Sequence, residues 1–163
     1  MKKTILFVMV FSVALYGCRR TEEFSNIPEI KFISFEKLQD MGGREVAILS
    51  FDFQDGDGDI GLNDYDIFPP FDTSSIYYYN FFCDYYEKQH GKFEKVELPG
   101  TLNARIPRLS QLKEESIKGT IFLTMPFYYD PFSQYDTLQL KFYIVDRKLN
   151  HSNVEEVVTT KGR

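Results

Sequence analysis

Apolar and polar residues alternate along most of the chain, and this period of two constrains the fold more than any other feature. Side chains of a strand point alternately to its two faces, so the alternation marks candidate strands. The runs cover residues 30–38, 44–53, 76–87, 92–98, 117–127, 138–146 and 153–160. Residues 102–112 are less regular, and we expect a short strand and then a helical turn there. About seven strands without amphipathic helices between them predict an all-β, antiparallel, immunoglobulin-like β-sandwich; a small barrel is the alternative.

The alternation also predicts which strand faces form the core. We expect one set of apolar side chains to point inward, and a register error of one residue would invert it. This set comprises Ala47, Leu49, Phe51, Tyr79, Phe81, Cys83, Ile121, Leu123, Leu140, Phe142 and Ile144.

The N-terminus, MKKTILFVMVFSVALYGC, has the pattern of an export signal. Lys2 and Lys3 precede an apolar stretch at 5–15 that is too short to span a bilayer. The small Gly17 before Cys18 resembles the lipobox of bacterial lipoproteins, in which the signal is cut before a cysteine that carries lipid. We therefore expect a signal peptide at 1–17, a lipidated Cys18 with a charged tether at 18–27, and one domain at 28–163. An ordinary secretory signal or an N-terminal membrane anchor is the alternative.

Charge and cysteine usage narrow the function classes. The formal net charge is −5, and Lys and Arg never cluster beyond a pair, which argues against a nucleic-acid partner. Cys18 and Cys83 are the two cysteines. Lipidation of Cys18 would leave Cys83 without a disulfide partner, so we expect it to be a small buried apolar residue.

The segment FDFQDGDGDIGLNDYD, at 51–66, is not explained by packing. No Lys or Arg occurs between Glu45 and Glu87, although aspartates crowd this segment. Carboxylates this close repel one another, so an ordered loop requires a cation or raised pKa values. Calcium suits such a loop because it accepts many oxygen ligands at flexible geometry. The alternative is a solvated acidic turn, since Asp and Gly favour tight bends.

The loop is not an EF-hand. With Gly58 at the invariant glycine, Asp55 and Asp57 take ligand positions, but Phe53 occupies the first position and Asp64 replaces the last glutamate. We predict Asp55, Asp57 and Asp59 as the first ligands. Asp64 or Asp66 and backbone carbonyls would supply others.

An immunoglobulin-like order makes a further prediction about this loop. The loops after its second and sixth strands emerge at the same end of the sandwich. Residues 55–66 would then lie near residues 146–153, and Asp146 or Asn150 would complete the coordination shell.

The lipobox, the charged tether and the DGDGDIG loop together resemble lipoproteins of Bacteroidota that lack an assigned activity. The ending YIVDRKLNHSN is similar to a hairpin near their C-termini. The resemblance implies a lipid-anchored β-sandwich in the cell envelope, at the outer membrane of a Gram-negative bacterium, and nothing about a substrate.

Catalytic patterns are missing from the sequence. His90 and His151 are the two histidines, and no nucleophile triad, zinc spacing or phosphate loop occurs. We therefore expect a non-enzymatic module with an unknown protein or glycan partner. The alternative function is an accessory glycan-binding lipoprotein, because Tyr78, Phe82 and Tyr86 share a predicted strand face with Asn80 and Asp84.

Overall fold

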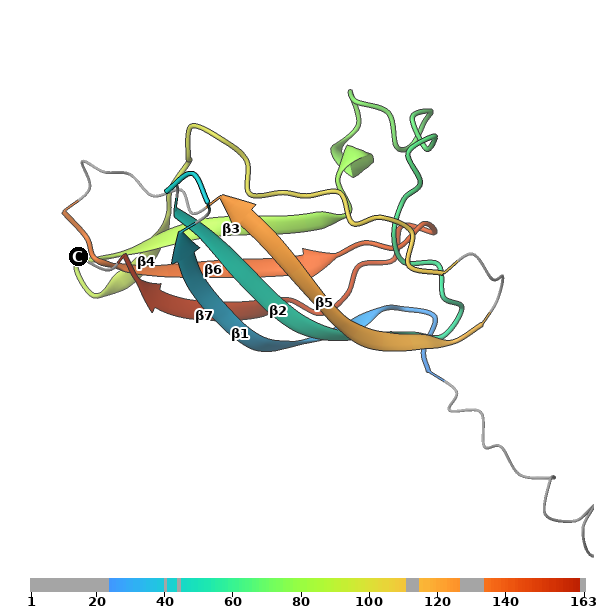
Figure 1. Ribbon diagram of the computed structural model, residues 1–163, viewed down its shortest axis with the longest axis horizontal. Coiled ribbons are helices and arrows are strands. Elements are labelled where there is room, and N and C mark those ends of the chain that lie inside the picture. Colours follow the sequence, from blue (N-terminus) through green and yellow to red (C-terminus); the bar gives the residue numbers. More distant parts are fainter. Residues whose placement is uncertain (1–23, 40, 44, 111–114, 127–133, 162–163) are drawn as a thin grey trace, which may run out of the picture.

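A computed structural model describes residues 24–39, 41–43, 45–110, 115–126 and 134–161 (Figure 1). These residues form seven strands and one 3-10 helix. In chain order they are β1 (Glu29–Gln39), β2 (Glu45–Asp55), η1 (Ile76–Tyr78), β3 (Phe81–Gln89), β4 (Lys92–Lys95), β5 (Ile117–Pro126), β6 (Thr137–Ile144) and β7 (Glu155–Thr160). Within the described ranges, no helix has the length and apolar character needed to cross a membrane.

The strands form two antiparallel sheets that pack face to face, which confirms the predicted β-sandwich (Figure 1). One sheet has the order β1-β2-β5 and the other has the order β4-β3-β6-β7. In immunoglobulin lettering, β2, β3, β6 and β7 therefore take the places of strands B, C, F and G. The fourth strand, β4, pairs with β3 rather than with β5.

The predicted inward face is confirmed. Phe51, Phe81 and Phe142 have no exposed surface, and their rings meet at the centre with centroids 5.5–6.0 Å apart. Register explains the match, because Phe51 lies opposite Ile121 and Cys83 lies opposite Phe142 on neighbouring strands. The other predicted core residues that are buried are Ala47, Leu49, Cys83, Ile121, Leu140 and Ile144. Tyr79 and Leu123 are half-buried.

Two segments differ from the predicted strands. The alternation at 76–80 is not a strand, because the Ser75 hydroxyl accepts a hydrogen bond from the Tyr77 amide at 3.0 Å and caps η1. Strand β3 begins only at Phe81. Residues 102–110 form isolated bridges, at Ala104 and Pro107, instead of a strand. The helical turn expected after them falls partly on 111–114, outside the described residues.

Candidate metal centre

The Asp/Gly loop leaves the end of β2 in a conformation that only its glycines permit. Gly58 has a φ of +66°, and a Cβ there would lie 2.2 Å from the Glu115 carbonyl oxygen. Glycine is therefore required on both conformational and steric grounds. Two buried apolar residues, Ile60 and Leu62, attach the far side of the loop to the core. The loop is thus a packed part of the fold and not a solvated turn.

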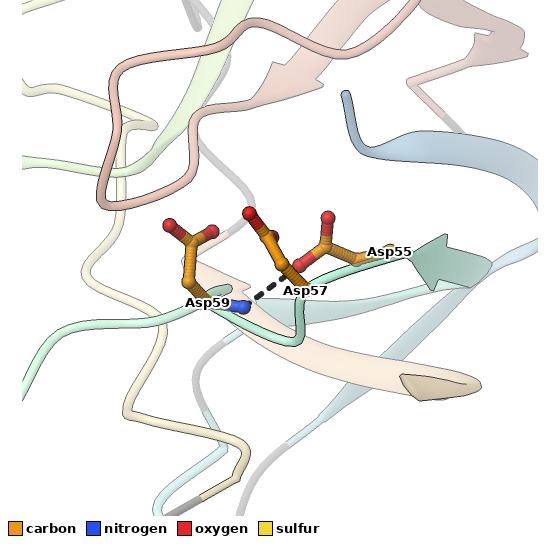
Figure 2. A group of neighbouring side chains, drawn as sticks. All are labelled: Asp55, Asp57 and Asp59. Carbon is orange, nitrogen blue, oxygen red and sulfur yellow. Dashed lines mark hydrogen bonds between the residues drawn. The ribbon is translucent and has the colours of Figure 1, made fainter. Parts of the chain in front are cut away.

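This conformation gathers three carboxylates. Asp55, Asp57 and Asp59 are all buried, and each offers an oxygen within 4.8 Å of the others. Figure 2 shows their side chains projecting from the same side of the loop. The Asp59 amide donates a hydrogen bond of 2.8 Å to Asp55 Oδ2. No described residue supplies a hydrogen-bond partner to the Oδ1 atom of any of the three.

The cluster carries an electrostatic cost in the absence of a cation. The pKa of Asp55 is raised to about 6, chiefly by burial and also by the charges of Asp57, Asp59 and Asp146, although a backbone hydrogen bond from Asp59 opposes the rise. Burial also raises the pKa of Asp59 to about 6, helped by Asp146 and Asp57. Buried carboxylate oxygens without hydrogen-bond partners, such as these Oδ1 atoms, are rare in stable domains, because desolvation of a charge is costly. A metal ion is one group that these carboxylates could hold.

Two basic residues of the β6–β7 loop lie beside the cluster, and Lys148 partly compensates its charge. Lys148 Nζ forms an ion pair with Asp57 Oδ2, although the lysine side chain is largely exposed. Arg147 pairs with the Asp66 carboxylate, and its hydrogen bonds lower the pKa of Asp66. The Arg147 amide also donates to the Asp59 carbonyl oxygen at 3.4 Å. These contacts confirm that the β2–β3 and β6–β7 loops lie at the same end of the sandwich.

The other predicted ligands have different positions. Asp146 is buried beside the cluster, where burial raises its pKa. Its two oxygens accept hydrogen bonds of 2.8 Å from the amide and side chain of Asn150. Asp64 is exposed and Asp66 is engaged by Arg147. The structure thus brings Asp55, Asp57 and Asp59 together with Asp146 nearby, and leaves Asp64 and Asp66 outside this group.

Sequence reasoning missed the basic residues around the loop. The segment 45–87 has no Lys or Arg, so its positive partners come from distant parts of the chain. The signal that could have found two of them is the Asp-Arg-Lys run at 146–148, directly after a predicted strand. Basic residues at such a position lie at the end of the sandwich that the acidic loop occupies.

The aromatic face considered for glycans has its rings engaged. Phe82 stacks on Tyr143 with ring centroids 5.0 Å apart. Lys141 Nζ lies 5.3 Å from the ring centroid of Tyr86, and Arg105 Cζ lies 5.1 Å from that of Tyr78. Asn80 is buried and exchanges two hydrogen bonds with the backbone of Ile106. Tyr78, Phe82 and Tyr86 are half-buried, so part of each ring remains at the surface.

We expect the metal-free protein to lose stability through this cluster as the pH rises from about 4 to about 6.5. The folded-state pKa values of Asp55 and Asp59, about 6, lie above the ordinary 3.8. The folded state therefore holds protons that the unfolded chain has released. The contribution is fully present below about pH 4 and is lost as the pH rises through about 6.

Chemical denaturation in the presence of a chelator, at several pH values, measures this effect. The Asp59→Asn protein should lose less stability over the same range than the native protein. If the free energy of unfolding depended on pH equally in the two proteins, the effect could not be assigned to the Asp cluster.

In comparisons with models of protein families, with curated proteins and with solved structures, none matches this chain. The chemistry of the cluster therefore carries the functional argument. A set of buried carboxylate oxygens suits a hard cation, whereas softer metals prefer sulfur or imidazole ligands. Cys83 lies elsewhere in the core, and burial raises the pKa of its thiol to about 12.

Proposed function

We propose that this chain is a lipid-anchored, non-enzymatic module of the cell envelope whose Asp/Gly loop binds calcium. The single observation that carries the calcium proposal is the set of three buried Oδ1 atoms, on Asp55, Asp57 and Asp59, without hydrogen-bond partners among the described residues. A bound cation would satisfy all three at once and remove their mutual repulsion.

Calcium fits this loop better than magnesium. Calcium takes six to eight oxygens at adaptable geometry, whereas magnesium demands a near-octahedral shell and retains its waters. The loop offers carboxylates in a shape fixed by Gly58 and by burial of Ile60, with backbone carbonyls between them. Asp146 is a further buried carboxylate whose charge acts on the cluster, and it would complete a shell after release from Asn150.

Lys148 has the role of an exchangeable counter-ion in this proposal. Its ammonium contacts Asp57 from an exposed position, so the ion pair contributes little to stability and breaking it costs little free energy. A single ammonium balances one of the clustered charges, and a divalent cation balances two. Calcium would therefore replace Lys148 at the Asp57 carboxylate.

The anchor part of the proposal rests on the lipobox-like Gly17-Cys18 after a short apolar segment. Cys18 lies outside the described residues. Acylation there would hold the sandwich at a membrane surface without a spanning helix.

Calcium titration tests the metal site. A cation that binds only the folded state stabilises it by about 2.7 kcal/mol at a hundredfold excess over Kd. We therefore expect the melting temperature to rise with the logarithm of calcium concentration. Asp57→Asn should remove most of that rise, because it deletes a charge from the centre of the cluster.

The matched control is Asp64→Asn, which removes an exposed carboxylate of the same loop. This variant should keep the calcium response. A melting temperature that is unchanged between chelator and millimolar calcium would reject the site.

A further inference from the structure

The long connection between β2 and β3 exposes apolar side chains close to the metal loop. Tyr65, Ile67, Phe68 and Ile76 have exposed fractions of 71%, 54%, 74% and 72%. We call these four residues the apolar tip. Large exposed apolar side chains in one segment are candidates for an interaction surface.

The backbone that carries the apolar tip is held in place. Arg105 donates hydrogen bonds to the carbonyl oxygens of Tyr78, at 2.8 Å, and Asp66, at 2.6 Å. Arg147 binds the Asp66 carboxylate and lies 5.7 Å from the ring of Phe71. Side chains displayed on a fixed backbone lose little conformational entropy when they bind. The apolar tip is thus pre-organised for a partner.

The N-terminal segment leaves the domain at the same end of the sandwich (Figure 1). Residues 24–26 lie on the metal loop, where the Gly56 amide donates a hydrogen bond of 2.8 Å to the Ser25 carbonyl oxygen. A Cβ at Gly56 would come within 2.3 Å of the Phe24 carbonyl oxygen, so glycine permits this close approach. These contacts define the point at which the chain departs toward Cys18.

The length of the remaining chain limits how far this end can stand from a membrane. Cys18 and Phe24 are six residues apart. Six residues span at most about 20 Å when fully extended. A lipid on Cys18 would therefore keep the metal end of the sandwich, and with it the apolar tip, close to the bilayer.

We propose that the apolar tip docks on the lipid bilayer in which Cys18 is anchored, so that the sandwich stands with its metal end on the membrane. This inference rests on the lipid anchor of the proposed function, and not on calcium. Aromatic and aliphatic side chains such as Phe68, Tyr65 and Ile67 suit the interface between headgroups and acyl chains. Because Asp64 and Asp72 are acidic neighbours in the same segment, the surface favoured is zwitterionic rather than anionic.

The absence of tryptophan allows a single reporter to be placed at will. The test uses acylated full-length protein, purified from membranes and reconstituted into phosphatidylcholine vesicles that contain brominated lipid. One variant is Phe68→Trp, in the apolar tip. Its matched control is Phe122→Trp, at a residue of β5 that is 72% exposed and lies outside the tip.

The F68W protein should lose most of its tryptophan emission to the brominated lipid, and its emission should shift to shorter wavelength. The F122W protein should keep both its intensity and its wavelength. Equal quenching of the two variants, or none in either, would overturn the docking. A change in the tryptophan emission of F68W that occurs only when a protein extract is added would assign the tip to a protein partner instead.

Mass spectrometry of the same samples separates the two proposals. If Cys18 is acylated but the F68W emission is not quenched, the docking is rejected and the lipid anchor is supported. An unmodified Cys18 rejects the anchor, and the docking falls with it. Neither result depends on calcium, whose binding is read independently from the melting temperature.

Discussion

Replacing Phe142 with alanine should lower the free energy of unfolding by about 3–5 kcal/mol. The Phe142 ring is fully buried between the two sheets, and the rings of Phe51, Phe81 and Phe32 surround it at 5.5, 5.9 and 6.5 Å. Truncation would open a cavity that four packed strands cannot close. Chemical denaturation of the calcium-free protein measures the loss.

The control for this prediction is Phe122→Ala. Phe122 is the same residue type, but it lies on the exposed face of β5, so its removal should change stability by less than about 0.5 kcal/mol. Similar losses in the two variants would contradict the central role of Phe142. The comparison also tests the register of β5, because Phe122 and its neighbour Ile121 lie on opposite faces.

Replacing Lys161 with methionine should destabilise the domain by about 3–5 kcal/mol. Lys161 Nζ lies 2.7 Å from Glu87 Oε1, and both side chains are more than nine-tenths buried. The Tyr85 hydroxyl donates to the same oxygen at 3.0 Å. Without the lysine, the Glu87 carboxylate would be a buried charge without its cation, which explains the large expected effect.

Two further variants distinguish the effect of an uncompensated buried Glu87 from the effect of removing any positive charge. Lys95→Met breaks the pair with Asp84, whose two side chains are about half exposed, and should cost at most about 1 kcal/mol. Adding Glu87→Gln to Lys161→Met should restore part of the stability, because it removes the buried negative charge of Glu87. A double variant less stable than K161M would contradict the assigned mechanism.

The anchor, the metal loop and the apolar tip meet at one end of the sandwich. The N-terminal segment contacts Gly56, which lies between two of the clustered aspartates. The side chain of Asn150 reaches both the Asn26 carbonyl oxygen, at 3.5 Å, and Asp146. In our proposal, calcium would order the loop on which the N-terminal segment lies. Our proposals assign metal binding and membrane attachment to a shared region of the fold.

The strands and the core could be predicted because their signal is local. Alternation places Leu49 and Phe51 on one face whatever the partner strand, and burial of that face then selects the register. The limit of this reasoning appears at residues 76–80, where aromatic alternation continues without a strand. There the local capping of η1 by Ser75 replaces strand pairing for Tyr77 and Tyr78.

For the candidate site, the sequence alone determined the acidic loop and, through the order of the strands, its position beside the β6–β7 loop. Only the tertiary structure decided which carboxylates are buried together. Asp64 and Asp66 belong to the same sequence pattern as Asp57, yet Asp64 faces solvent and Arg147 holds Asp66. The physical reason is that desolvation and ion pairing depend on atoms brought together from distant segments. Composition records the charges of this chain, but the packing of its two loops determines which of them lack a partner.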